Sequence, residues 1–159
     1  YKGKLYLEII PQSFSIIVKK GLSLNQIRFY KDRQKNNSFI KSEDISIYIK
    51  RNEICAYKAK KNTSAINLSK LNHYRVNDFW EIIITKDNNF IIEKDEFYIL
   101  RSLENIKIED TIAAELEPFV YNFGNFRVHY AGFFDPGFGN TKLGTPAVFE
   151  LRAYDTPFY

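Results

Sequence analysis

The sequence lacks several features, and each absence limits what the protein can be. It has a single cysteine, Cys55, which excludes an internal disulfide framework and favours a reducing compartment. No apolar run approaches the roughly 20 residues of a membrane-spanning helix, and no signal-peptide pattern opens the chain. We therefore predict a cytoplasmic protein without a membrane partner. Methionine is absent throughout, position 1 included, and we expect a portion of a longer chain.

Glycine and proline are also scarce, with seven and five residues among 159, whereas aromatic residues make up 16%. This balance favours an ordered, sheet-rich protein that is large enough for one substantial core. The net charge is +4, and the basic residues gather in residues 19–35 and 50–61. Such clusters suit a polyphosphate ligand or nucleic acid, but they equally describe a solvated surface. We expect no nucleic-acid partner.

Apolar residues recur mostly with a period of two, which indicates half-buried strands. Turn-forming residues separate these runs, notably in 20–21, 87–89, 94–95 and 122–125. Helix signals are confined to 110–116, and the polar stretch 60–71 reads as a loop. The sequence therefore predicts an all-β fold with strands in 5–9, 45–49, 81–85, 90–93, 97–100, 106–108 and 126–131.

The most informative stretch is 126–151, where an aromatic-rich strand enters the turn Asp135-Pro136-Gly137. Proline presets φ and glycine accepts a positive φ, so this tripeptide is strong turn chemistry. The strand that follows carries one acid, Glu150, between Phe149 and Leu151. That carboxylate must either face solvent or be desolvated and available for proton transfer.

An internal repeat accompanies this motif. Residues 7–16 align without gaps on residues 149–158, so that Glu8 aligns with Glu150. The first copy is followed by Gly21-Leu22-Ser23-Leu24-Asn25-Gln26-Ile27-Arg28-Phe29, whereas the second copy ends at Tyr159. The repeat predicts two related units, of which residues 1–30 close the first.

Taken together, these motifs resemble the dCTP deaminase branch of the dUTPase-like family, in its long, two-domain bacterial form. The resemblance rests on Asp135-Pro136-Gly137, on Phe149-Glu150-Leu151, on the run 21–29 and on the strand pattern of 97–108. It implies a β-clip, or distorted barrel, of many short strands with one or two short helices at most. It also implies three parts: residues 1–30 end a preceding domain, 31–77 form an insertion or linker with strands, and 78–159 form a second, truncated domain.

The resemblance further implies hydrolysis of dCTP to dUTP and ammonia, with Glu150 as general acid and base. Ala131 and Gly132 would lie beside the pyrimidine. Mg²⁺ would arrive with the triphosphate, and the usual oligomer is a trimer, or a pseudo-trimer built from tandem domains. Zinc chemistry is excluded by ligand count, because zinc deaminases need His-x-Glu and Pro-Cys-x-x-Cys. This chain has one cysteine, Cys55, and two histidines, His73 and His129, and the residues around them match neither motif.

One departure from the family pattern is serious. Where the family has Gly-Arg-Ser-Ser at the triphosphate, this chain reads Glu115-Leu116-Glu117-Pro118-Phe119-Val120. Two glutamates would repel the triphosphate unless Mg²⁺ intervened. Arg127 either supplies the missing cation from the next strand or is an ordinary surface residue.

Several other residues keep two readings. Asp135 is either a turn residue or a substrate contact. Glu8 is either the catalytic base of the preceding domain or an acid without a catalytic role. His129 is either a packed histidine or a catalyst, and the single tryptophan, Trp80, reads as core or interface. The alternatives to deamination are dUTP pyrophosphate hydrolysis, a non-catalytic nucleotide-binding or assembly domain of the same fold, and a nucleic-acid-binding module.

Overall fold

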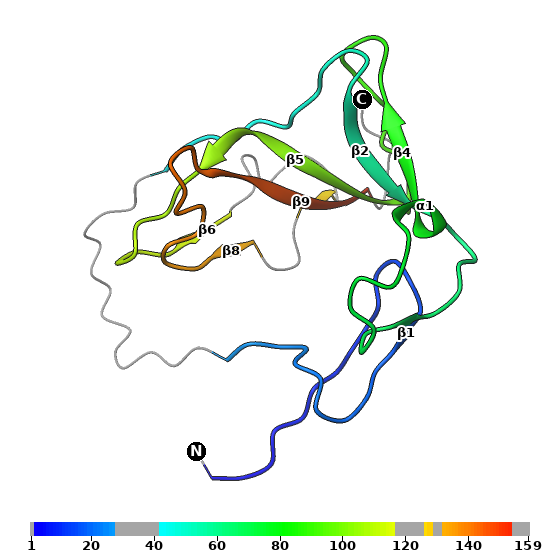
Figure 1. Cartoon of the computed structure of the whole chain (residues 1–159), viewed down its shortest axis with the longest axis vertical. Coiled ribbons are helices and arrows are strands. Elements are labelled where there is room, and N and C mark those ends of the chain that lie inside the picture. Colours follow the sequence, from blue (N-terminus) through cyan, green and yellow to red (C-terminus); the bar gives the residue numbers. More distant parts are fainter. Residues whose placement is uncertain (1, 28–41, 117–125, 129–131, 154–159) are drawn as a thin grey trace.

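A computed structural model describes residues 2–27, 42–116, 126–128 and 132–153, with only the backbone of 126–128. Its main feature is a five-stranded antiparallel sheet with the strand order β4-β2-β5-β9-β7. The long strands β5 (Phe97–Ile106) and β9 (Thr145–Ala153) form its centre. β2 (Ile54–Ala59) and β4 (Trp80–Ile84) make an arm at one end of that ribbon (Figure 1), and β7 (Phe126–Val128) is the far edge.

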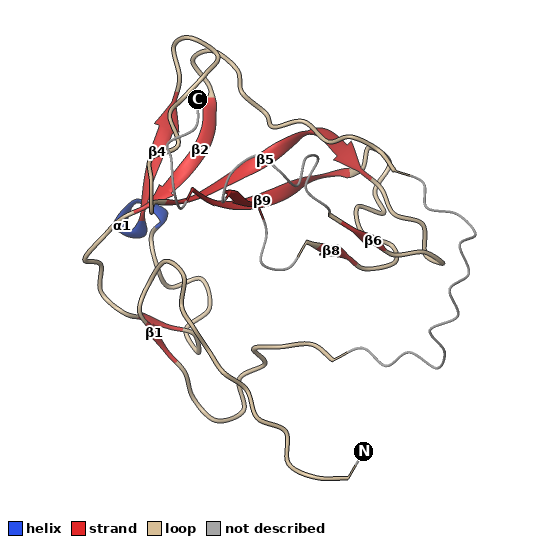
Figure 2. Cartoon of the chain, turned by 180° about the vertical axis from the view of Figure 1, so that it is seen from behind, coloured by secondary structure: helices blue, strands red, loops and turns tan. Residues whose placement is uncertain are grey.

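Two small sheets flank the main one. β1 (Ile16–Ile17) pairs in parallel with β3 (Ile66–Asn67). β6 (Ala114–Glu115) pairs antiparallel with β8 (Phe133–Phe134), beneath the end of β5 and β9 that lies away from the β2–β4 arm (Figure 2). A single helical turn, α1 (Val76–Phe79), leads directly into β4. The expected all-β fold class is therefore confirmed, with one short helix in the described part of the chain.

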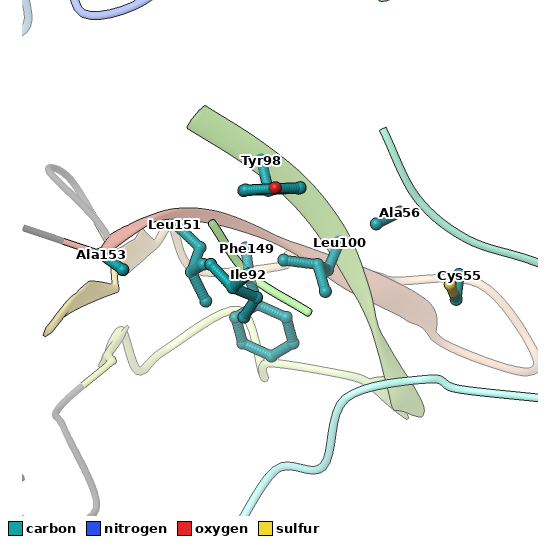
Figure 3. Close-up of a cluster of buried hydrophobic side chains, with 8 residues drawn as sticks. All are labelled: Cys55, Ala56, Ile92, Tyr98, Leu100, Phe149, Leu151 and Ala153. Atoms are coloured by element: carbon teal, nitrogen blue, oxygen red, sulfur yellow. The ribbon is translucent and has the colours of Figure 1, made fainter. Parts of the chain in front are cut away.

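One face of the main sheet carries the larger core. Alternate residues of β9 are buried, and the buried residues of the adjacent strand β5 lie beside them (Figure 3). Leu151 is fully buried, and Tyr98 uses its hydroxyl to accept a hydrogen bond from the Glu93 amide (3.2 Å). The period-two pattern thus places one set of side chains inside and the other set on the opposite face. The buried members are Cys55, Ala56, Ile92, Tyr98, Leu100, Phe149, Leu151 and Ala153.

A bulge interrupts the pairing of β5 with β9 between Arg101 and Asn105. An irregular register leaves a backbone donor without its ladder partner, which is costly inside a core. Ser102, which is completely buried, repairs this defect: its hydroxyl accepts from the Ala147 amide (2.8 Å) and donates to the Glu104 carbonyl (2.6 Å). Ser102 therefore stabilises the bulge, which explains why a serine occurs in the middle of a hydrophobic strand.

The opposite face of the sheet holds a second cluster, formed by Phe14, Ala59, Phe79 and Phe97. Phe14 comes from the N-terminal segment and meets Phe79 and Trp80 edge to face, with ring centroids 5.4 and 5.1 Å apart. Edge-to-face pairs of this kind add to the burial of the rings themselves. The segment around Phe14 is thus attached to the sheet although it forms only the two-residue strand β1.

Several strand predictions are confirmed and others are wrong. The predictions for 81–85, 97–100 and 126–131 correspond to β4, β5 and β7, although β5 is longer than expected and residues 129–131 lie outside the described residues. Residues 5–9 form no strand, and 45–49 contribute only an isolated bridge from Ile47 to Ser102. The helix expected in 110–116 is wrong, because its end pairs with β8 as β6. The loop expected in 60–71 contains β3, and β2 and α1 were not foreseen.

Among the described residues, no helix has the length and hydrophobicity that a bilayer crossing would require. Cys55 is a buried free thiol whose Sγ lies 3.4 Å from the Ile83 carbonyl oxygen. Burial raises the pKa of this thiol, which keeps it protonated and unreactive.

Candidate active site

Glu150 lies in the middle of β9, on the face opposite the larger core. Its neighbours Phe149 and Leu151 are buried on that core, so alternation directs Glu150 to the side of the second cluster. Its register partner on β5 is Ile99, which packs against that cluster. Glu150 is half-buried, and no hydrogen bond or ion pair reaches its carboxylate from the described residues. Glu150 is therefore not a fully solvated acid, and no salt bridge from the described part of the chain neutralises it.

Arg152 follows two positions later on the same face and strand. Its guanidinium carbon lies 5.7 Å from the centre of the Phe97 ring, and its Nη2 donates to the carbonyl oxygen of Gln12. Its Nε is buried and has no hydrogen-bond partner among the described residues. A half-buried carboxylate and a half-buried guanidinium group thus lie on the same face of β9, at positions about 7 Å apart along the strand.

The Asp135-Pro136-Gly137 turn forms as predicted. The Phe138 amide donates to the Asp135 carbonyl (3.0 Å), and Gly137 has φ +80°. The turn packs against the far end of the β5–β9 ribbon, where the Ile108 amide donates to the Phe138 carbonyl (2.9 Å). Asp135 itself is exposed, which suits the turn role.

The segment that replaces the expected phosphate motif begins beside this turn. Glu115 pairs with Phe133, and the Leu116 amide donates to the carbonyl of Gly132 (2.6 Å). Glu115 is exposed, and residues 117–120 lie outside the described residues. The acidic Glu115 is thus next in sequence to Leu116, whose amide is bonded to the predicted pyrimidine contact Gly132.

The remaining predicted site residues are only partly placed. Ala131 and His129 lie outside the described residues. The backbone of Arg127 pairs with Arg152, which makes position 127 a diagonal neighbour of Glu150 on the adjacent strand. Glu8 is exposed in an irregular segment.

Within one chain, the predicted site residues form two separate groups. Position 127 lies beside β9, the strand of Glu150, whereas Asp135 belongs to the turn that contacts Ile108 and Glu109, beyond the end of β5 that pairs with Thr145. Thr145 and Glu150 are five positions apart on β9, which corresponds to about 17 Å.

An open, mostly apolar groove of about 530 Å³ borders the Glu150 face. Its walls come from β2, β4, β5 and β9, and Ile99, the register partner of Glu150, is among its lining residues. Val148 also lines it, two positions before Glu150 and on the same face. No site residue proposed from the sequence lines this groove, and part of its wall comes from β2, which the sequence pattern did not reveal.

The structure thus combines a strand-rich fold with a single acid on the central strand β9 and an Asp-Pro-Gly hairpin. Comparison with known proteins identifies the family that has this class of fold. Residues 18–159 match the sequence model of the 2'-deoxycytidine 5'-triphosphate deaminase C-terminal domain, and residues 1–33 match that of the N-terminal domain. None of the curated proteins compared with the chain matches it.

Among solved structures, 2'-deoxycytidine 5'-triphosphate deaminase from Agrobacterium tumefaciens is similar, with 40% sequence identity and a TM-score of 0.66. That match covers 72% of this chain and 37% of the Agrobacterium chain, so the chain spans little more than a third of that protein. The chain belongs to the 2'-deoxycytidine 5'-triphosphate deaminase family.

Arg152 was not singled out from the sequence, although a signal for it existed. In the alignment of the two repeats, Arg152 stands where the first copy has Ile10. A change from an apolar to a cationic residue, two positions after the aligned acids, distinguishes the second copy from the first.

Proposed function

We propose that this chain is part of an enzyme that hydrolyses dCTP to dUTP and ammonia, with Glu150 as general acid and base. Membership of the family supports the reaction. The observation that supports the residue is the half-buried carboxylate on β9, which no hydrogen bond or ion pair reaches from the described residues. A carboxylate in such a place can exchange protons with substrate and water, since no lysine or arginine of the described residues forms an ion pair with it.

The proposed chemistry needs one base that later acts as an acid. Glu150 takes a proton from water while the oxygen attacks C4 of the cytosine ring, and it passes this proton to the ring nitrogen N3. Glu150 then takes the proton of the new C4 hydroxyl and delivers it to the amine as the C4–N4 bond breaks and the C4 carbonyl forms, so that ammonia leaves. The balance is dCTP plus water to dUTP plus ammonia, without an oxidant or a metal at the ring.

The substrate in this proposal is dCTP as its Mg²⁺ complex. Glu115 is exposed next to the strand that leads into the Asp-Pro-Gly turn, and a bare triphosphate would be repelled there. A divalent cation bound to the phosphates would remove that repulsion. The sequence supports zinc independence, because it offers one cysteine and two histidines in unsuitable contexts. Ammonia release that required added zinc after chelation, and not Mg²⁺, would contradict this proposal.

The experiment that tests the role of Glu150 is Glu150→Gln, with Glu8→Gln as the matched control from the other repeat. Both changes keep the shape of the side chain and remove the carboxylate. We expect E150Q to reduce ammonia release from dCTP by about 10²–10⁴-fold, which is the usual contribution of a positioned acid or base. E8Q should keep the wild-type rate. Full ammonia release by E150Q would refute the assignment.

We also propose that the site is completed across subunits or tandem domains, as a trimer or pseudo-trimer. The separation of Glu150 from the Asp-Pro-Gly hairpin along β9 supports this. Mixing E150Q with an inactive variant of the hairpin tests it, because complementary subunits should restore activity. No recovery in a mixed oligomer would contradict shared sites.

A second candidate is a nucleotide-binding or assembly domain without catalysis. The observation that favours it is the absence of Arg and Ser from 115–120, where the family holds its phosphate motif. Calorimetry with dCTP and an ammonia assay on the same preparation separate the two functions. Binding without ammonia release would favour the second candidate, and pyrophosphate release from dUTP would instead indicate a pyrophosphatase.

The cytoplasm is the proposed location, since the one thiol is buried and unpaired, as in a reducing compartment. Cell fractionation would test this, and recovery with secreted proteins would contradict it.

A further inference from the structure

We propose that Arg152 is a positioning residue that holds the segment 12–17 over the sheet face carrying Glu150, so that this segment forms a wall of the active site. The inference rests on the proposed role of Glu150. It adds a residue that acts through another part of the chain and does not itself touch the reacting atoms.

The contact that carries the proposal links two parts of the chain 140 positions apart. The Arg152 guanidinium donates from Nη2 to the carbonyl oxygen of Gln12, while its flat face lies over Phe97. Hydrogen bonds from charged donors are stronger than neutral ones, and arginine combines them with stacking on aromatic rings. Arg152 is therefore bound on one side to the sheet and on the other side to the N-terminal segment.

Two further contacts show that the segment is attached to this same face. Phe14 is buried against Phe79 and Trp80, in the cluster that also contains Phe97. Just beyond it, the Ile66 and Leu68 amides donate to the carbonyls of Ser15 (2.8 Å) and Ile17 (3.2 Å). Arg152 is the residue of β9, the strand of Glu150, that reaches this attached segment.

The electrostatics of Arg152 explain why the segment matters to it. Within the described part of the chain, no carboxylate lies in ion-pair distance of the guanidinium. A partly buried cation without a counter-charge needs other acceptors, since desolvation is expensive. The Gln12 carbonyl and the Phe97 ring supply that compensation, although the buried Nε remains without an acceptor. Removing the segment would leave the cation with the aromatic ring alone.

The repeat supports a role particular to the second copy. Ile10, which aligns with Arg152, is exposed in the first copy, so the repeat unit does not require an arginine at this position for its own fold. The partner of Arg152 lies two residues after Ile10. The arginine of the second copy thus binds the backbone of the first copy, close to the acid Glu8, whose segment serves here as structure.

The first test measures attachment without any reference to catalysis. Arg152→Met keeps the aliphatic stem and removes all donors, and Arg152→Lys keeps the charge with a different geometry. We expect R152M to speed hydrogen exchange at the Ile66 and Leu68 amides by about tenfold, and R152K to have a smaller effect. The emission of Trp80, the only tryptophan, should shift to the red as Phe14 moves away.

The matched control is Arg101→Met. Arg101 lies on β5 and also covers an aromatic ring, with its guanidinium carbon 3.6 Å from the centre of Tyr48. It does not contact the segment 12–17, so R101M should leave both amides and the Trp80 emission unchanged. Equal exchange in R152M and wild type would overturn the positioning role.

The second test joins position to function in the full chain. A loosened wall should raise KM for dCTP several-fold and change kcat less, with partial recovery in R152K. A merely structural role would lower the amount of active protein and leave KM unchanged. Faster exchange with an unchanged KM would overturn the wall and keep the attachment. If wild-type protein releases no ammonia from dCTP, the proposed function fails, whereas the exchange experiment still decides the role of Arg152.

Discussion

Two glycines approach one backbone oxygen, and this crowding permits a sharp prediction. A Cβ on Gly139 would lie far inside 3.0 Å of the Ile106 carbonyl oxygen, and 3.2 Å from the Thr145 amide nitrogen. A Cβ on Gly144 would lie 2.9 Å from the same oxygen. Both residues have positive φ, as does Gly21, whose Cβ would meet nothing within 4 Å. Alanine at these three positions therefore separates backbone strain from steric conflict.

The magnitudes follow from the two effects. Positive φ costs a residue with a Cβ about 1–2 kcal/mol, and this applies at all three positions. Gly139 at +66° is closer to the left-handed minimum than Gly21 at +91°, so strain alone would make Gly21→Ala the worse variant. The conflict with Ile106 adds about 1–3 kcal/mol of overpacking at Gly139, since a backbone oxygen cannot rotate away. The destabilisation should therefore increase from G21A through G144A to G139A.

Urea unfolding followed by circular dichroism measures this order through the change in free energy of unfolding. We expect G139A to be destabilised by about 2 kcal/mol more than G21A. Equal stabilities within about 0.5 kcal/mol would show that the hairpin after Asp135 is not packed on Ile106 as described, and the reasoning would be refuted.

Two further predictions concern single contacts. Ser102→Ala leaves the buried Ala147 amide without its acceptor and should destabilise the protein by about 1–3 kcal/mol, whereas the exposed Ser64→Ala should be neutral; equal effects in urea unfolding would contradict the role of Ser102 in the bulge. The hydrogen bond from Lys58 lowers the pKa of Glu93 below 4.5, so its stabilisation is present above about pH 4.5 and is lost as the pH falls through the folded-state value. The small stability difference between wild type and Lys58→Met should therefore shrink in acid. Thermal unfolding at about pH 7 and pH 3 measures this difference, and an equal difference at both pH values would contradict the prediction.

The elements that the sequence predicted are those whose local pattern and tertiary partners agree. β5 and β9 are rich in apolar and aromatic residues and pair with each other, so the local sequence was sufficient. β2 escaped prediction because Cys55 and Ala56 are weak strand formers, and their burial depends on the sheet around them. Residues 110–116 have helical propensity, but pairing of Ala114 with Phe134 prevails over it. In 5–9 the alternation is real, yet no described strand pairs with it.

The candidate site divides in the same way. Glu150 stood out because one acid interrupts an apolar strand, and a local pattern is enough to reveal it. Arg152 did not, because its significance comes from Gln12, which is remote in sequence and contributes only a backbone carbonyl. A backbone partner leaves no residue type to recognise. The groove beside Ile99 was invisible for a related reason, since four strands must assemble before it exists.

The outer edge of β4 has a consequence for handling the protein. Ile82 and Ile84 are 40% and 57% exposed, and no strand in the described chain pairs with the outer edge of β4. An open edge rich in isoleucine is a template for a strand from another molecule, which is the first step of ordered aggregation. Glu81 and Lys86 flank the run as charged gatekeepers. Colloidal behaviour during concentration and storage should therefore depend on these two charges more than on the thermodynamic stability of the core.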